Sequence, residues 1–89
     1  MKVYIIGNKG NIEDFNKADE YIRGCGDTPI NMTKILSFLD DFNLSDQIAI
    51  CYELIRISDA VYCTGNDKGN FMAAMERAKA EKDNKEIYE

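Results

Sequence analysis

The chain has 89 residues and a formal net charge of −5. A chain of this length forms one domain, residues 1–89, and buries only about 60–65% of its unfolded surface, so we expect it to associate into a homo-oligomer, a dimer or larger. Its lysines and arginines form no basic cluster, which argues against a nucleic acid polymer as a partner.

Cysteine content and the first residues indicate a cellular compartment. The chain has three cysteines and no histidine, and the cysteines form no CxxC pair. A zinc site or a disulfide framework is therefore not expected, and a reducing environment fits best. The opening apolar segment, MKVYII, is too short for a signal peptide, and no apolar run reaches membrane-spanning length. We predict a cytoplasmic protein with no metal, no cofactor and no membrane partner.

The first part of the chain predicts two strands with a helix between them. Residues 2–6 are an apolar run rich in β-branched and aromatic residues, which is typical of a buried parallel strand. Asn11 is placed to cap a helix that runs to about Arg23 and ends at Gly24. Residues 28–32 predict a second short strand, whose proline suits an edge strand or the start of a strand.

The second part predicts three more helices and two more strands. The predicted segments are helices over 33–42, 46–57 and 68–82, and strands over 60–63 and 86–88. Ser45 and Asp67 are placed to cap the second and third of these helices. The apolar stripe of the last helix is predicted to consist of Phe71, Ala74, Met75 and Ala78.

Alternating strands and helices predict an α/β fold of three layers, with about four parallel strands and helices on both faces. Because crossovers are right-handed, few topologies remain, and the simplest is the flavodoxin-like or Rossmann-like strand order 2-1-3-4. In this order the first and third strands are neighbours. Ligand sites of such folds lie at the carboxyl ends of the two strands between which the chain changes direction.

Both of these strands end at a glycine beside an asparagine, in KVYIIGN (2–8) and DAVYCTGND (59–67). Glycine lets a backbone approach a ligand closely, and the helix start after each loop favours anions. Each loop taken alone is equally well explained as a tight turn with a helix cap and no ligand. Together, across one crevice, they predict a small-molecule site. The residues expected to contact the ligand are Tyr4, Gly7, Asn8, Gly10, Asn66 and Gly69.

Four segments carry a family pattern: VYIIG (3–7), DFNKADEYIRGCGDTPIN (14–31), ISDAVYCTGNDKG (57–69) and MERAKAEKDNKEIYE (75–89). In order and spacing they resemble the nucleoside 2-deoxyribosyltransferase-like family, in particular its short bacterial and phage members. The segments are similar to the family's strand-one "YIAGP", its "N…F…A…L…G…(V/I)NP", its "cDavy…S.G" and its closing "E…A…g.piy". The resemblance runs from end to end of the chain.

The resemblance implies chemistry at an N-glycosidic bond. Active members break or exchange this bond in a nucleoside or nucleotide, and a glutamate attacks the anomeric carbon to form a covalent glycosyl-enzyme. A carboxylate suits this step because the transition state resembles an oxocarbenium ion and the leaving base needs a proton from a second group. The resemblance places Tyr4 near the sugar, makes Glu76 the nucleophile, and has Asp67 hold the ribose or position the base.

Two positions depart from the family. The family's glutamate lies four residues after the helix glycine, which is Ala73 here, whereas Glu76 lies seven after Gly69. Three residues move a side chain about 60° around a helix and about 4.5 Å along it, unless the helix begins later, with residues 70–72 still in the loop. Cys51 stands where the family has an aspartate. Without the resemblance, Glu76 is equally a solvated carboxylate on a helix flank.

Three functions therefore remain open. The first is a nucleosidase or deoxyribosyltransferase that uses Glu76 with help from Asp67. The second is a catalytically impaired relative that binds a nucleotide-like ligand, and the third is an interaction module. The loops favour a protein that keeps a ligand, and the resemblance implies that this partner is a nucleoside or nucleotide. The departures at Ala73 and Cys51 favour a protein without catalysis. Tyr4 and Tyr62 either line a slot for the base or belong to the core.

Overall fold

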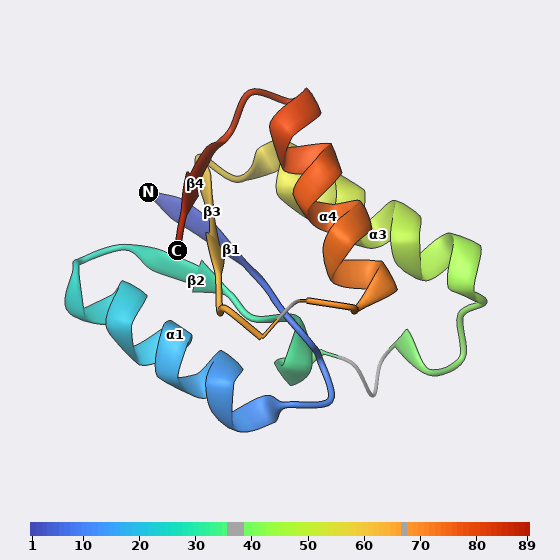
Figure 1. The fold of residues 1–89 in the computed structure, drawn as a ribbon, viewed down its shortest axis with the longest axis horizontal. Helices are drawn as coiled ribbons and strands as arrows, with labels where there is room; N and C mark the ends of the chain where they lie inside the picture. The colour runs from blue at the N-terminus through green and yellow to red at the C-terminus, as the bar shows by residue number, and fades with distance from the viewer. Residues whose placement is uncertain (36–38, 67) are drawn as a thin grey trace.

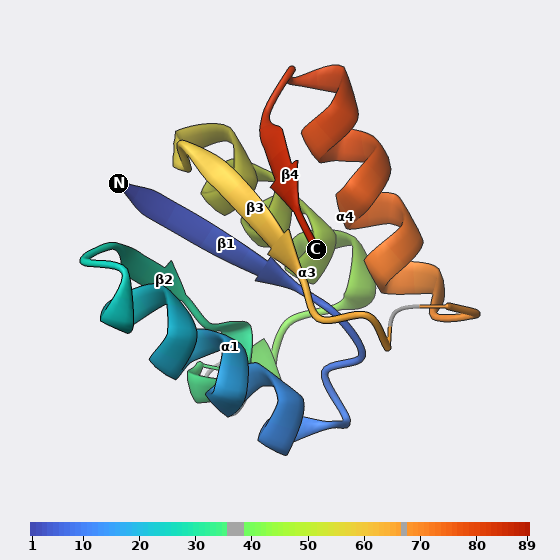
Figure 2. The ribbon, with the colours of Figure 1, turned by 60° about the vertical axis from the view of Figure 1, so that its left-hand side comes forward.

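The structure, a computed structural model, describes residues 1–35, 39–66 and 68–89. Its elements are β1 (Lys2–Ile6), α1 (Ile12–Gly24), β2 (Thr28–Ile30), the 3₁₀ turn η1 (Met32–Lys34), α3 (Leu44–Ile57), β3 (Ala60–Cys63), α4 (Phe71–Lys82) and β4 (Glu86–Tyr88). The strands form one parallel sheet in the order β2-β1-β3-β4, as Figure 2 shows. The predicted α/β fold and strand order are confirmed. No helix of the described ranges is long and apolar enough to cross a membrane.

The sheet separates two apolar clusters, because side chains alternate between the faces of a strand. Tyr4 and Ile6 of β1 pack with α3 and α4, whereas Val3 and Ile5 pack with α1. Figure 1 shows α1 on one side of the sheet and α3 and α4 on the other. β1 is thus buried on both faces, which explains why its sequence is a continuous apolar run.

Each of the three α-helices within the described ranges begins at an asparagine. Asn11, Asn43 and Asn70 each accept a hydrogen bond from the backbone N–H three residues later, at 3.3, 2.8 and 2.8 Å respectively. Such side chains satisfy N–H groups that have no partner within the helix. The first cap was predicted correctly. The predicted caps at Ser45 and Asp67 are wrong, since α3 begins earlier and α4 later than expected.

The segment predicted as a helix over 33–42 begins differently. Met32–Lys34 form the 3₁₀ turn, and the Asn31 side chain accepts a hydrogen bond from the backbone N–H of Thr33 at 3.1 Å. Leu39 is buried in the core under α3 and α4. Residues 36–38, which lie within the predicted helix, are outside the described part of the chain.

The face of α4 that packs on the sheet consists of small side chains and one carboxylate. Ala73, Glu76 and Ala80 are fully buried, whereas Phe71 is 70% exposed. The prediction that Phe71, Ala74, Met75 and Ala78 form the buried apolar stripe of this helix is wrong. Alanines let the helix approach the sheet closely, and this rotation of α4 turns Glu76 towards β1.

Asp19 links α1 to the segment that follows β2. Its side chain is 5% exposed, and it accepts hydrogen bonds from Arg23 at 2.8 Å, from Lys34 at 2.9 Å and from Asn31 at 3.1 Å. Burial by itself raises the pKa of Asp19, but the hydrogen bonds from Lys34, Arg23 and Asn31 outweigh it and hold the pKa below its ordinary value. The ionised form therefore stabilises the fold.

We predict that Asp19→Asn lowers the free energy of unfolding at neutral pH by about 1–3 kcal/mol, because charge-assisted hydrogen bonds are lost from a buried group. Since the folded-state pKa lies below the unfolded one, this contribution disappears as the pH falls through the folded-state value. Urea unfolding at neutral and acidic pH measures the change, with Glu20→Gln on the exposed side of α1 as the control. If Asp19→Asn lowered the free energy of unfolding by the same amount at neutral and at acidic pH, the prediction would be contradicted.

Candidate functional site

The carboxyl ends of β1 and β3 lie side by side, as the sequence predicted. Asn66 joins the two loops that follow them. Its Oδ1 accepts hydrogen bonds from the backbone N–H of Asn8 at 3.1 Å and from the Thr64 hydroxyl at 2.6 Å. Its Nδ2 donates to the Asp14 carboxylate at 2.5 Å. The two loops and the first turn of α1 therefore form one hydrogen-bonded unit.

Glycine is required at several positions of the two loops, including Gly65, whose φ is +92°. A Cβ on Gly7 would lie 2.4 Å from Thr64 Oγ1 and 3.1 Å from Asn66 Oδ1, so the two loops touch at this residue. Gly69 has a φ of +76°, in the left-handed region that side chains disfavour. At Gly10 the nearest atom is the side-chain oxygen of Asn8, which accepts the Gly10 backbone N–H at 3.0 Å.

Glu76 lies inside the fold, in the second turn of α4, with 1% of its side chain exposed. Its Oε1 forms an ion pair with Lys9 Nζ at 2.8 Å, and its Oε2 accepts a short hydrogen bond from the Tyr4 hydroxyl. The carboxylate thus joins α4 to β1 and to the loop after β1. The alternative in which Glu76 is a solvated carboxylate on the helix flank is wrong.

Cys51 of α3 completes this cluster, since its thiol interacts with both Tyr4 and Glu76. Burial, together with the negative charge of Glu76, raises the pKa of Tyr4 well above its ordinary value, so the phenol stays protonated and can donate to the carboxylate. Burial also raises the pKa of the Cys51 thiol. We call Tyr4, Lys9, Cys51 and Glu76 the carboxylate cluster.

Six of the eight predicted site residues fall into two adjoining groups, and Gly69 directly precedes the cap of α4. Tyr4 and Glu76 meet in the carboxylate cluster. Gly7, Asn8, Gly10 and Asn66 belong to the hydrogen-bonded unit formed by the two loops, which we call the loop unit. Lys9 connects the groups, because it follows Asn8 in the loop and pairs with Glu76. Asp67 lies outside the described residues. Both asparagine side chains are already engaged within the loops.

Lys9 is the residue of the carboxylate cluster that the sequence analysis did not single out. Nothing in the sequence distinguishes a lysine in a glycine-rich loop. Its ion pair with Glu76 depends on the rotation of α4, which turns Glu76 towards β1. The alternative in which Tyr4 and Tyr62 line a slot for the base is wrong. Tyr4 is buried on the α3–α4 face of the sheet, whereas Tyr62 packs on the α1 face.

The described residues include no group of three His, Cys, Asp or Glu side chains placed to hold a metal. What the cluster offers is an oxygen nucleophile, flanked by an ammonium and a neutral phenol. No family model, curated protein or solved structure matches the chain. The resemblance to nucleoside 2-deoxyribosyltransferase-like proteins therefore stays a prediction from the sequence.

We predict that Gly7→Ala destabilises the fold by about 1–3 kcal/mol, because the new methyl group overlaps the Thr64 hydroxyl and the loops cannot separate without breaking the hydrogen bonds of Asn66. In a Thr64→Ala background the same substitution should cost less, which a double-mutant cycle by urea unfolding measures. Gly24→Ala is the control, since a Cβ at Gly24 meets no atom within 4 Å. Equal costs in both backgrounds would rule out the contact as the cause.

The carboxylate cluster supports a second stability prediction. Lys9→Met leaves the buried carboxylate without its cation and should cost about 3 kcal/mol or more. The triple change Tyr4→Phe, Lys9→Met, Glu76→Leu should unfold within about 1 kcal/mol of the unchanged protein, since apolar replacements often match buried ion pairs.

Urea unfolding of both variants checks this comparison. Lys17→Met is the matched control, because Lys17 is 71% exposed and its pair with Glu13 is long, at 3.5 Å. A triple variant as unstable as Lys9→Met would show that the polar cluster itself maintains the fold.

Proposed function

We propose that the chain binds a nucleoside or nucleotide at the carboxyl ends of β1 and β3 and breaks or exchanges its N-glycosidic bond, with Glu76 as nucleophile. The observation that carries this proposal is the convergence of Tyr4, Cys51 and Glu76 at one point. The resemblance places Tyr4 near the sugar and makes Glu76 the nucleophile, and Cys51 stands where the family has an aspartate. These positions, on β1, α4 and α3, are far apart in the sequence.

The cost of burying Glu76 supports a role in function. A buried ion pair seldom stabilises a fold more than apolar residues of the same size, because both charges lose their hydration. A lone carboxylate on the inner face of an alanine-lined helix is therefore poorly explained by packing. Perturbed titratable groups gather at functional sites more than elsewhere.

Lys9 controls access to the carboxylate in this proposal. Tyr4 is fully buried, while 15% of the Lys9 side chain is exposed, so a ligand from solvent reaches Oε1 by displacing the ammonium group. An Oε1 freed in this way attacks the anomeric carbon. The C–N bond then breaks, the base leaves with the electron pair and takes up a proton from a second group, and water later releases the sugar. Asp67 holds the ribose or positions the base.

A second candidate is a relative that keeps the ligand and has lost catalysis. Both oxygens of Glu76 are occupied by partners, and Cys51 stands in place of the family's aspartate. A thiol whose pKa is raised by burial cannot supply the charge of a carboxylate at neutral pH. These observations favour binding without turnover.

Incubation with 2′-deoxynucleosides and their 5′-monophosphates, followed by chromatography for free base, tests the enzyme. We expect base release that falls at least about 10³-fold in Glu76→Gln, since the nucleophile is removed. Glu81→Gln, at an exposed position of the same helix, is the control and should leave the rate unchanged. Mass spectrometry of the quenched reaction should detect the glycosyl-enzyme in the unchanged protein and in Glu81→Gln but not in Glu76→Gln.

Thermal unfolding with the same compounds separates the two candidates. A ligand at 100 times its Kd adds about 2.7 kcal/mol to stability, whether or not turnover follows. A shift with no base release would support the binding protein. No shift and no release with any compound would remove both candidates.

A further inference from the structure

The two faces of the sheet are unequally covered. A parallel sheet is normally covered by helices on both faces, since its strands are apolar on both. Here α3 and α4 cover one face, while α1 lies on the other and packs against β1 and β2. Among the described residues, no second helix lies beside α1 over β3 and β4. In the described part of the chain, the half of this face over β3 and β4 therefore has no helix on it.

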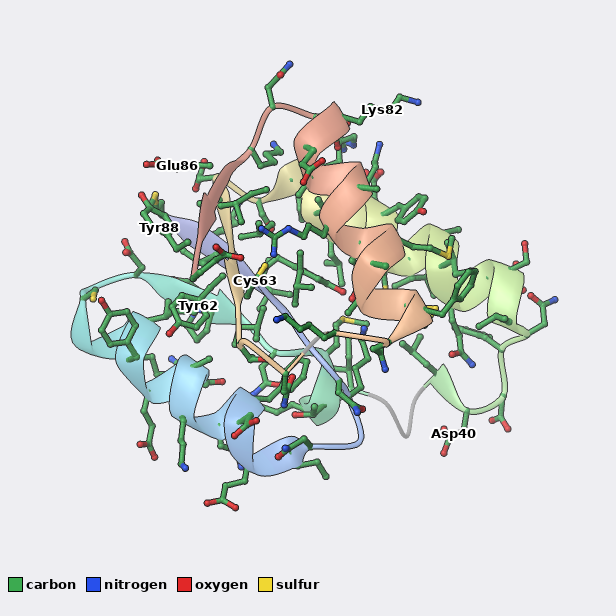
Figure 3. All side chains as sticks on the ribbon, in the orientation of Figure 1. Asp40, Tyr62, Cys63, Lys82, Glu86 and Tyr88 are labelled. Carbon is green, nitrogen blue, oxygen red and sulfur yellow. The ribbon has the colours of Figure 1, made fainter. Side chains whose placement is uncertain are left out.

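A groove follows this half of the face. Two hollows of about 310 and 210 Å³ adjoin there, and both are lined by Tyr21 of α1 and Tyr62 of β3. Tyr88 of β4 lies directly beside Tyr62 in the register of the sheet, and Figure 3 shows both on the side away from α3 and α4. The rings of Tyr21 and Tyr62 are 5.7 Å apart, and Tyr21 and Tyr88 are 61% and 38% exposed.

Carboxylates surround these aromatic rings. Asp14 lies at one end of the groove, and Asp27 and Glu89 lie at the other. Glu86, on the same face of β4 as Tyr88, raises the pKa of Tyr88 by hydrogen bonding to its hydroxyl. Lys17 and the N-terminal ammonium of Met1 are the cations among the described residues that line the groove; the Met1 ammonium pairs with Asp27 at 2.9 Å, and Arg77 pairs with Glu89 at 2.6 Å. The four carboxylates outnumber these three cations around the groove, which we call the tyrosine groove.

We propose that the tyrosine groove docks an amphipathic helix of a partner protein, with an apolar stripe on the three tyrosines and lysine or arginine flanks facing the carboxylates. Charge complementarity identifies this occupant. A second copy of the chain would bring the same carboxylates and a net charge of −5, so it is disfavoured. The proposal is independent of the chemistry at Glu76, which lies on the other face of the sheet.

The neighbouring helix sets the size of the occupant. α1 has 13 residues and covers the other half of the same face. A docked helix of about 13 residues, roughly 20 Å long, would complete the layer. Aromatic rings that are half-exposed and surrounded by polar groups are typical anchors for such an interface.

Binding of a labelled synthetic peptide of about 14 residues, with leucines at positions i, i+3, i+4 and i+7 and lysines elsewhere, tests the proposal by fluorescence anisotropy. A scrambled peptide of the same composition keeps the charge and loses the stripe. We expect binding at least about tenfold tighter than that of the scrambled peptide, and weaker binding in high salt.

Matched variants locate the site. Tyr62→Ser with Tyr88→Ser should weaken binding at least about tenfold, whereas Tyr52→Ser on α3 should not. Circular dichroism checks that each variant is folded. Glu86→Gln changes an exposed group and should also weaken binding, unlike Asp46→Asn on α3.

Three results would overturn the proposal. The first is equal binding of the scrambled peptide. The second is an unchanged affinity of Tyr62→Ser with Tyr88→Ser for the amphipathic peptide. The third is a dimer in analytical ultracentrifugation that Tyr62→Ser with Tyr88→Ser dissociates, which would make a second copy the occupant.

Discussion

The contact between the ends of β1 and β3 is the constraint on which the rest of this structure depends. The two strands are parallel neighbours at the centre of the sheet, and Gly7 allows the loops after them to touch. Asn66 then holds the loops and the start of α1 together. This places Lys9 where it can pair with a carboxylate of α4. Without that approach, the loops would not form one hydrogen-bonded unit and Lys9 would not be held beside Glu76.

The carboxylate cluster contains the two kinds of partner that a buried carboxylate needs. The ammonium group of Lys9 compensates the charge, and the phenol of Tyr4 satisfies the second oxygen without adding charge. Such a cluster is stable when complete and costly when one member is removed. A ligand that displaces one of these partners must supply the charge or the hydrogen bond that the partner supplied. This requirement suits a binding site.

The sequence predicted the strands, their order and the meeting of the two loops because these follow from apolar runs, handed crossovers and glycine placement. The rotation of α4 could not be predicted in this way, since Ala73, Glu76 and Ala80 form no apolar period and Phe71 looks like a core residue. The helix caps failed for a related reason, because Asn43 and Ser45 are both good cap residues and only packing chooses between them. The family resemblance nevertheless named Tyr4, Cys51 and Glu76, which meet in space.

The distribution of the three thiols has a practical consequence. Cys51 and Cys63 are buried in the core, while Cys25 is exposed and lines the tyrosine groove. A thiol reacts as the thiolate and only where reagents can reach it, so a maleimide dye should attach to this protein at a single position. The native chain therefore carries its own attachment point for a spectroscopic reporter, without any engineered residue, on the face where a partner is expected.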